Sequence, residues 1–325
     1  MSIVVSKETY FKSLKNFEQV PYTQTSGWCD YVACTKPDST LFLMDSPSCP
    51  SIACQGQEKK RLGKKMLLVE GLCFRSQNIS SKTIKAFLEE IIRLHYDMIE
   101  LTLNQPYFPE LEIGIRQAGF LRPVGCFLSS LSLWIDITTP VDYNQNWKRN
   151  LKRAHSLPLL FEPIESPTEK DRDQFLSMYS ELQKDKGFSH RLTKKELSAM
   201  LCSTSFQLAF VKDSKGIPLS CILYHIVGTH AGLLYAAKSE AAKETGATFY
   251  MYEQLFAYLS QRGITCFDME KLVPSTHSKN SVFLFKNGIK GRHVTYSGEW
   301  AWYKKSHYRP LLYFVKKYLM KKDEV

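Results

Sequence analysis

The sequence predicts an α/β protein with mixed sheets, built as two tandem copies of one α/β unit. The first observation is helical periodicity: residues 84–91 and 252–259 carry apolar side chains at i, i+3, i+4 and i+7. Both segments run directly into a short apolar strand. The second observation is length, because 325 residues suffice for two domains that each bury a core. We place the boundary near residue 140, giving a first domain at 1–140 and a second at 141–325.

The third observation is an internal repeat. Three landmarks recur in the same order at nearly one offset, and a fixed offset is the mark of a duplicated unit. They are Ile99 and Phe267, 168 positions apart (99 to 267), Gly119 and Gly288, 169 apart (119 to 288), and Trp134 and Trp302, 168 apart (134 to 302).

In the first unit, prolines at 47 and 50 predict a loop, and those at 106 and 109 predict a stiff elbow. Between these breaks the apolar patterns predict strands and amphipathic helices. The predicted helices cover 7–17, 81–96 and the residues after Pro109 to 118, and the predicted strands cover 40–44, 66–74, a strand at 98 and a strand pair within 121–136.

The second unit begins after a basic helix around Trp147. Its predicted order is strand, two helices, three strands, helix, strand, helix and strand, which describes a mixed sheet with helices on both faces. The turn at 213–216 (DSKG) predicts a hairpin between the first two of the three strands. The predicted segments are 157–162, 169–186, 194–202, 207–212, 219–228, 231–237, the helix containing 252–259, 264–269, a short helix from about 278, and a strand through Trp302.

Composition favours a cytoplasmic protein. The start of the chain lacks the long apolar core of a secretory signal, and no window is apolar enough to cross a bilayer. Nine cysteines, an odd number scattered through predicted elements, fit free thiols in a reducing compartment. The C-x4-C pairs at 29–34 and 49–54 offer four thiols of the kind that can bind zinc. If 28–34 is a strand, the thiols of Cys29 and Cys34 point to opposite faces, so we predict no metal.

A net charge of +11 predicts an anionic partner, such as RNA, a phosphorylated substrate or a membrane surface. The positive side chains form three clusters, each of which would also suit an ordinary solvated face. The clusters lie at 59–65, 148–153 and 304–322. The last one mixes lysines with aromatic residues, a composition typical both of interfacial membrane segments and of a closing helix packed on its own domain.

The segment 263–305 is the candidate site. A strand that ends in Asp268 and Glu270 is followed by an elbow, a short helix and the tetrapeptide 285–288 (FKNG). Ligands of open α/β sheets bind at the carboxyl ends of strands, and residues at alternate positions share a face, so either carboxylate could accept a proton from an amine. Pairing of these carboxylates with Arg292 or Lys271 is the structural alternative. Lys286 would supply a fixed positive charge, or simply favour the end of its helix.

Five segments, in order, resemble the Fem aminoacyl-transferase family, whose members consist of tandem units with the fold of Gcn5-related N-acetyltransferases (GNAT). The resemblance covers nearly the whole chain, and its most specific part is the final segment, which is similar to a Phe-Lys-x-Gly motif at the family's active cleft. The segments are 24–28 (QTSGW), 70–71 (EG), 147–154 (WKRNLKRA), 184–188 (KDKGF) and 285–288 (FKNG).

This resemblance implies transfer of an aminoacyl group from aminoacyl-tRNA, or of another acyl group, to an amine, as in peptidoglycan bridge formation on cell-wall precursors. It implies that Lys286 stabilises the oxyanion as an electrostatic catalyst, with Asp268 or Glu270 as base. Further candidates for substrate binding follow from position. They are Phe285, Asn287, Tyr235, Lys186, Arg191 and Trp28. The structural alternatives are core packing for Phe285 and Tyr235, and a solvated loop for Lys186 and Arg191.

Two departures from related enzymes limit the prediction. GNAT enzymes hold the pyrophosphate of coenzyme A in a glycine-containing turn before the central helix. Here the matching residues 243–248 (KETGAT) place Glu244 where its charge would repel phosphate, which disfavours acyl-CoA as donor. In addition, residues 169–202 lack the sustained heptads of the coiled-coil arm found in some bridge-forming enzymes. We therefore predict an acyltransferase without a bound cofactor, and keep as alternatives a non-catalytic RNA-binding descendant of the fold and an N-acyltransferase that uses acyl-CoA or acyl carrier protein.

Overall fold

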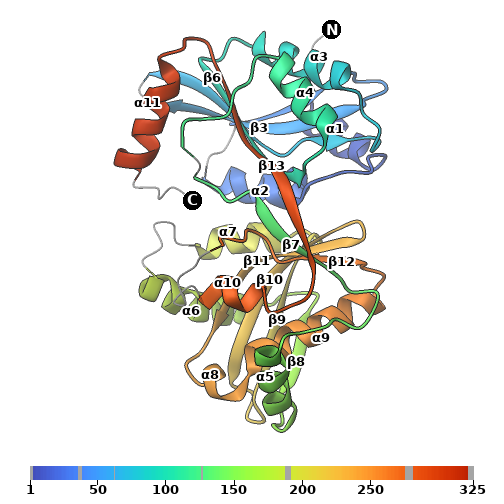
Figure 1. The fold of residues 1–325 in the computed structure, drawn as a ribbon, viewed down its shortest axis with the longest axis vertical. Helices are drawn as coiled ribbons and strands as arrows, with labels where there is room; N and C mark the ends of the chain where they lie inside the picture. Colours follow the sequence, from blue (N-terminus) through green and yellow to red (C-terminus); the bar gives the residue numbers. More distant parts are fainter. Residues whose placement is uncertain are drawn as a thin grey trace. The chain divides into compact units, whose positions relative to one another are not determined.

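Two compact units, each with its own mixed sheet, make up the structure (Figure 1). The computed structural model describes residues 3–35, 39–61, 63–125, 127–186, 192–274 and 281–320. Unit 1 consists of residues 1–131 together with 295–325, and unit 2 of residues 132–294. The expected boundary at residue 140 placed 132–140 in the first domain and 295–325 in the second, whereas the structure places them in unit 2 and unit 1 respectively. The pairing of strands β7 and β13, described below, explains this difference.

Unit 1 begins with helices and hairpin strands and ends with the C-terminal segment. Most of its helices start with a serine cap or a proline, for example Ser6 before α1 and Ser80 before α3, whose side chains accept from the backbone N–H three residues on. Its elements are β1 (Val4–Val5), α1 (Lys7–Leu14), η1 (Tyr22–Gln24), α2 (Ser26–Thr35), β2 (Thr40–Met44), β3 (Ile52–Arg61), β4 (Lys64–Glu70), β5 (Cys73–Phe74), α3 (Ser81–Ile92), β6 (Met98–Pro106), α4 (Pro109–Gln117), the C-terminal part of β13 (Arg292–Tyr303), α11 (Tyr308–Phe314) and η2 (Val315–Leu319).

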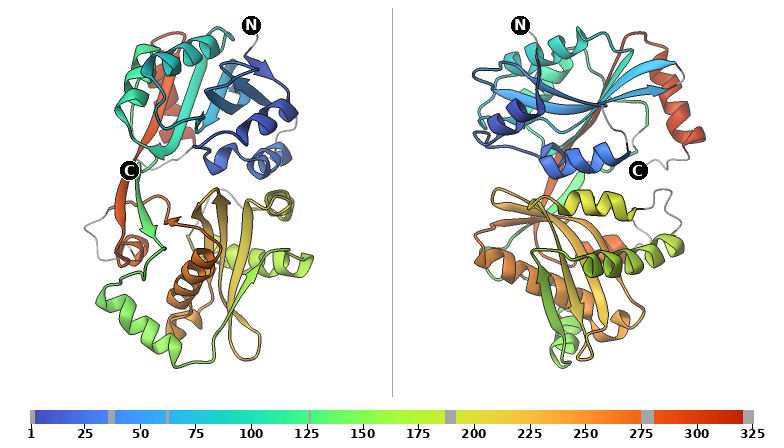
Figure 2. Two further views of the ribbon diagram at one scale, coloured as in Figure 1. Left: turned by 90° about the vertical axis from the view of Figure 1, so that its right-hand side faces the viewer. Right: turned by 180° about the vertical axis from the view of Figure 1, so that it is seen from behind.

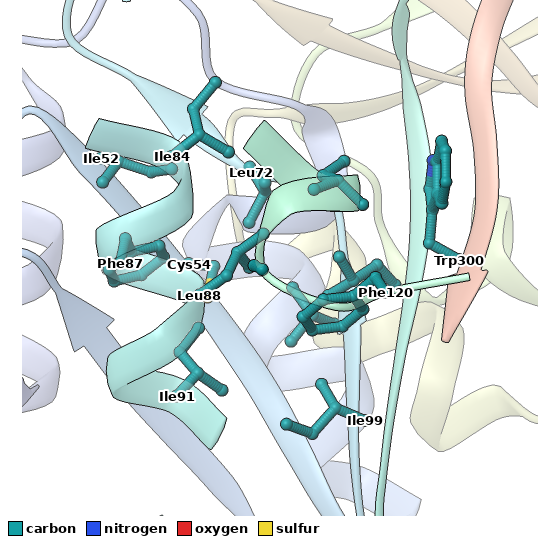
Figure 3. Close-up of a cluster of buried hydrophobic side chains, with 14 of the residues drawn as sticks. Ile52, Cys54, Leu72, Ile84, Phe87, Leu88, Ile91, Ile99, Phe120 and Trp300 are labelled. Atoms are coloured by element: carbon teal, nitrogen blue, oxygen red, sulfur yellow. The ribbon is translucent and has the colours of Figure 1, made fainter. Parts of the chain in front are cut away.

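The sheet of unit 1 has the strand order β1-β2-β3-β4-β6-β13, with β5 paired to β3. Neighbouring strands are antiparallel except β4 and β6, which run parallel. Helices α3 and α4 cover one face, and α1 and α2 cover the other (Figure 2). Apolar side chains of α3 pack on strand residues beneath it, such as Ile52 of β3 and Ile99 of β6. Together they form the main core of the unit (Figure 3).

Unit 2 repeats this plan with a longer antiparallel portion. Helix α6 begins at Glu169 and ends at Lys186, as the sequence predicted, and α7 starts with a full capping box between Thr193 and Glu196. The elements are β7 (Leu131–Asp136), α5 (Gln145–His155), β8 (Leu160–Ile164), α6 (Glu169–Lys186), α7 (Lys194–Leu201), β9 (Phe206–Lys212), β10 (Pro218–Val227), β11 (His230–Lys238), α8 (Ala242–Thr245), α9 (Ala247–Gln261), β12 (Cys266–Asp268) and α10 (Ser281–Lys286).

The sheet of unit 2 has the order β7-β12-β11-β10-β9-β8, and only β11 and β12 run parallel. Helices α6 and α9 lie on opposite faces of this sheet (Figure 2). The ring of Tyr179 on α6 meets Tyr235 on β11 at 5.1 Å, and Tyr252 on α9 meets Phe267 on β12 at 6.3 Å. Because side chains alternate along a strand, Asp268 faces the α6 side of the sheet.

The repeat appears in the structure as an exchange of strands. In each unit a helix leads into a strand with one parallel neighbour: α3 precedes β6 beside β4, and α9 precedes β12 beside β11. The antiparallel neighbour on the other side comes from elsewhere in the chain. Strand β7, which follows α4 of unit 1, pairs with β12, whereas β13, which follows α10 of unit 2, pairs with β6. This pairing assigns 132–140 to unit 2 and returns 295–325 to unit 1.

Three local predictions were wrong. Residues 28–34 belong to helix α2 rather than a strand, because Thr25 and Ser26 start a helix there. Strand β3 was not predicted because it contains polar residues such as Gln55. The backbone N–H and carbonyl of Gln55 are buried and bond with the side chain of Gln24. The predicted strand pair within 121–136 is one strand, β7, and an isolated bridge between Leu121 and Ala301. In the part of the chain that the structure describes, no helix is both long and apolar enough to span a membrane.

Candidate active site

The candidate site is the backbone elbow that follows β12. Lys286, at the end of α10, has only 8% of its surface exposed and reaches under this elbow. Its ammonium Nζ donates to the carbonyl oxygens of Met269 at 2.5 Å, Glu270 at 3.0 Å and Lys271 at 3.1 Å. An ammonium has three donors, so these three bonds saturate it. Burial lowers the pKa of Lys286 to about 8.

Glu270 sits at the apex of the elbow in a strained backbone conformation. Its φ is +55°, in the left-handed region that side chains other than glycine seldom adopt. Such strain persists where surrounding bonds impose it, and it clusters at functional sites. Here the bonds to Lys286 supply that constraint. The carboxyl group is only 14% exposed, and burial raises its pKa to about 7, although the nearby charges of Lys271 and Lys286 act to lower it.

Asp268 braces the same elbow from the last position of β12. One carboxylate oxygen, Oδ1, accepts from the backbone N–H of Glu270 at 2.7 Å and from the hydroxyl of Ser132 on β7. The register of β7 and β12 places Trp134 opposite Asp268, which brings Ser132 beside the elbow. These two bonds give Asp268 a bracing role, whereas the pKa of about 7 makes Glu270 a carboxyl group that can exchange a proton at neutral pH.

His225 on β10 is a component of the site that the sequence did not reveal. Its Nε2 lies 3.7 Å from Oε1 of Glu270, beyond hydrogen-bonding distance. Burial lowers the pKa of His225 to about 4, so the imidazole is neutral at pH 7. The ring lies directly over Gly232 on β11, where a Cβ atom would overlap Nε2. Residues 225 and 270 are too far apart in the sequence for a local spacing pattern to connect them. Only the antiparallel pairing of β10 and β11 could have indicated this contact.

Strands β11 and β12 separate at the elbow. They pair at three positions, the last being Gly232 opposite Asp268, after which β11 continues to Lys238 paired with β10. The register between β10 and β11 shifts here, so that Leu234 is a bulged residue. In unit 1, by contrast, β4 and β6 pair at five positions. Gln105 then bridges them further, bonding both the N–H and the carbonyl of Leu72. Parting of the two parallel strands is therefore a property of unit 2.

A groove of about 770 Å³ lies along the same strands of unit 2. Asp136 opposite Cys266 and Trp134 opposite Asp268 share one face of the sheet, so the groove follows the face that carries the elbow. It is lined by Trp134, Asp136, His230, Cys266, Lys290 and Arg292, among others. The guanidinium of Arg292 lies over the Trp134 ring at 5.4 Å, which gives the groove an aromatic wall with a positive charge above it. Arg292 therefore stacks on an indole here, which differs from the ion pair with a carboxylate considered from the sequence.

Other predicted substrate contacts lie at different places. Phe285 packs in an aromatic cluster with Trp147 at 4.8 Å, and its carbonyl accepts from the Trp147 indole at 2.8 Å. Gly288 permits this packing, because a Cβ there would overlap the indole. The absence of a side chain at Gly288 thus makes room for Trp147. Asn287 is exposed, with its Oδ1 3.3 Å from Nε2 of His293.

The remaining candidates are Tyr235, Trp28, Lys186 and Arg191. Tyr235 lies on the part of β11 beyond the last pair with β12 and packs edge-on against Tyr179 of α6. Trp28 belongs to unit 1, where its indole N–H donates to Glu70 at 3.0 Å. The side chain of Lys186 and all of Arg191 lie outside the described residues. No group of three or more metal-binding side chains occurs within the described ranges.

No protein-family model matches the chain, and no curated protein matches its sequence. Among solved structures, FemX aligns with a TM-score of 0.76 at 12% identity over 95% of this chain and 98% of FemX. The C-terminal domain of a putative lysylphosphatidylglycerol synthetase from Agrobacterium fabrum gives 0.62 at 12% identity, over 95% and 97%. A tandem GNAT protein from the clavulanic acid biosynthesis pathway gives 0.50 at 11% identity, over 93% and 97%. These likenesses confirm the predicted fold class, a tandem GNAT-like α/β fold.

Proposed function

We propose that the protein is a Fem-type acyltransferase that moves an aminoacyl or other acyl group to an amine, with Glu270 as general base. The observation that carries this proposal is the state of Glu270: a buried carboxyl group with a pKa of about 7, on an elbow fixed by Lys286 and Asp268. A base with a pKa near the working pH is the most effective one for accepting an amine proton. The fold shared with FemX agrees with this chemistry.

The proposed reaction needs one base and one fixed positive charge. The amine nitrogen attacks the carbonyl carbon of the acyl ester, which forms a C–N bond and a tetrahedral oxyanion. Glu270 accepts the proton that leaves the nitrogen. Collapse of the intermediate breaks the bond to the leaving oxygen, or sulfur for a thioester, and that atom takes the proton from Glu270. The products are an amide and a free hydroxyl or thiol, so the carboxylate is regenerated.

Lys286 acts in this scheme chiefly by holding the elbow. All three of its N–H donors are used by carbonyls 269–271, so a direct bond to the oxyanion would require one of them to be released. Its positive charge still acts at short range in a buried site, where electrostatic effects are stronger than in water. From the sequence we proposed Lys286 as the electrostatic catalyst. We now propose that it is a positioning residue whose positive charge also acts on the site.

We favour aminoacyl-tRNA over acyl-CoA as donor because the start of α9 is covered. A Cβ at Gly246, the residue before α9, would overlap the carbonyl of Asn150 on α5, and Arg153 donates to the carbonyl of Lys243 at 3.1 Å. These contacts occupy the helix terminus that would otherwise receive a pyrophosphate. By contrast, α5 turns four basic side chains to solvent while burying Trp147, and such a face suits a polyanion. The four are Lys148, Arg149, Lys152 and Arg153.

We propose an amine on a cell-wall precursor as acceptor, on the resemblance to the Fem family, with the reaction in the cytoplasm. The lysylphosphatidylglycerol named for one structural neighbour makes a lipid-linked acceptor the competing choice. Donors can be compared directly. The protein is incubated in parallel with labelled aminoacyl-tRNA, acyl-CoA and acyl carrier protein, together with a panel of amines, and loss of label from each carrier is measured.

The proposal predicts release from aminoacyl-tRNA that falls about 100-fold or more in Glu270→Gln and is unchanged in Glu240→Gln, a matched change at an exposed carboxylate of unit 2. Release from acyl-CoA alone would keep acyl transfer and reject the tRNA donor. Binding of tRNA without release from any carrier would instead favour the RNA-binding descendant of the fold, and would remove the enzyme proposal.

A further inference from the structure

The C-terminal segment of unit 1, residues 308–320, is attached to its sheet by one side. Tyr308 and Leu312 are buried against Met66 and Met98. One turn further on, the buried ammonium of Lys316 lies 3.4 Å from Glu100 and 3.5 Å from Glu299, on neighbouring strands. A buried lysine needs such partners, so these contacts fix which side of the segment faces the protein.

The opposite side of the segment is apolar and exposed. Phe314 and Tyr318 are 52% and 57% exposed, and their rings pack against each other at 4.9 Å. Leu311 precedes them at helical spacing, and Leu319 follows with 64% of its surface exposed. An apolar stripe of this kind on a segment whose other face is already buried is typical of a surface that binds something else.

A loop tied to the segment carries exposed apolar side chains as well. Arg309 donates to the carbonyl of Arg122 at 2.8 Å, which ties the loop to α11. On either side of that carbonyl, Leu121 and Val124 are exposed as well. Exposed apolar side chains therefore occur on two sequence-distant parts of unit 1 that this hydrogen bond connects.

Basic residues are frequent in this part of the sequence. Residues 300–322 contain no aspartate or glutamate, whereas the same stretch contains seven lysines and arginines. Lys304 and Lys305 are exposed immediately before α11. The ammonium of Lys317 lies 5.9 Å from the Tyr318 ring, so a charge adjoins the aromatic pair. Pairing of this face with a second copy of the chain would bring two positive surfaces together, which disfavours self-association.

We propose that this face, defined by Leu311, Phe314, Tyr318 and Leu319 with its rim of lysines, docks on a membrane surface that carries anionic lipid head groups. Phenylalanine, tyrosine and leucine would enter the interface while lysines contact the head groups, the combination of apolar and electrostatic attraction that stable peripheral binding requires. The inference is independent of the acyl-transfer proposal, because it concerns a surface of unit 1 rather than the elbow of unit 2.

Co-sedimentation of the full chain with large vesicles provides the test. We expect binding to phosphatidylcholine vesicles that contain phosphatidylglycerol, little binding to phosphatidylcholine alone, and release when salt is raised. Loss of the two half-exposed rings in Phe314→Ala/Tyr318→Ala should weaken the partition by about 30-fold. The matched control is Leu160→Ala/Ile217→Ala, which removes two side chains of unit 2 that are equally exposed, and it should bind as the wild type does.

Melting temperatures of both double variants should equal that of the wild type, because all four side chains project into solvent. Should Phe314→Ala/Tyr318→Ala melt lower, Phe314→Trp replaces it, and quenching of the new indole by brominated phosphatidylglycerol must exceed that of Leu160→Trp. Equal binding to uncharged vesicles, or an unchanged partition in Phe314→Ala/Tyr318→Ala, would overturn the proposal. So would light scattering that shows a dimer abolished by the same two substitutions, since the face would then join two copies.

Discussion

Replacing Lys286 by methionine tests whether the buried ammonium holds the elbow. The substitution keeps the length of the side chain but removes three donors, leaving the carbonyls of 269–271 without their partner. At about 1 kcal/mol for each lost bond, unit 2 should lose about 3 kcal/mol of stability. For a unit of this size that lowers the melting temperature by about 6–12 °C. Removal of the positive charge also takes away an influence that lowers the pKa of Glu270, so that pKa should rise above about 7.

Two measurements on Lys286→Met test whether the ammonium holds the elbow. Thermal unfolding followed by tryptophan fluorescence gives the stability, and the pH dependence of acyl transfer gives the shift of the acidic limb. Lys194→Met is the control, since its ammonium is exposed and pairs with Glu169 and Asp173 at the surface of unit 2. A variant that melts like the wild type but has lost turnover would refute the positioning role, and would return Lys286 to the role of direct oxyanion stabiliser suggested by the resemblance to Fem enzymes.

Three further predictions concern unit 2. Transfer should rise with pH as Glu270 ionises near 7 and fall as Lys286 deprotonates near 8, so the profile is bell-shaped, and a flat profile would exclude Glu270 as base. Because the folded state holds the Glu270 proton up to a higher pH than the unfolded state, wild type should lose stability relative to Glu270→Gln by about 3 kcal/mol between pH 4.5 and 7, as equilibrium unfolding at several pH values would measure. Gly288→Ala should destabilise by about 1–3 kcal/mol through overlap with Trp147, whereas an unchanged melting temperature would mean that α5 can shift away.

The order of elements in unit 2 was predictable because its helices and strands have clear periodicity and strong end signals. The hairpin at 213–216 and the full extent of α6 are examples. Strand exchange was not predictable, because the patterns of β7 and β13 specify strands but not their neighbours. Register and partner choice depend on tertiary packing.

The candidate site was predicted in part. Alternation along the predicted strand pointed to Asp268 and Glu270, and the Fem resemblance pointed to Lys286. The structure brings these three residues together at one elbow. The sequence could not show in which direction the neighbouring side chains point. Lys286 turns beneath the chain to carbonyls, and Phe285 turns into the aromatic core around Trp147. His225 was missed because it lies 45 positions from Glu270 (225 to 270) in an otherwise apolar strand, and the contact between them arises only in the folded sheet.

In the proposed mechanism, the carboxyl group of Glu270 takes the proton of an amine during acyl transfer. The most direct test of this step is the single-turnover rate of transfer from labelled aminoacyl-tRNA to an amine, measured across pH for wild type, Glu270→Gln and Glu240→Gln. We expect a rate that rises through pH 7 for wild type and Glu240→Gln, and a rate about 100-fold or more lower for Glu270→Gln. Transfer by Glu270→Gln at the wild-type rate would contradict this mechanism.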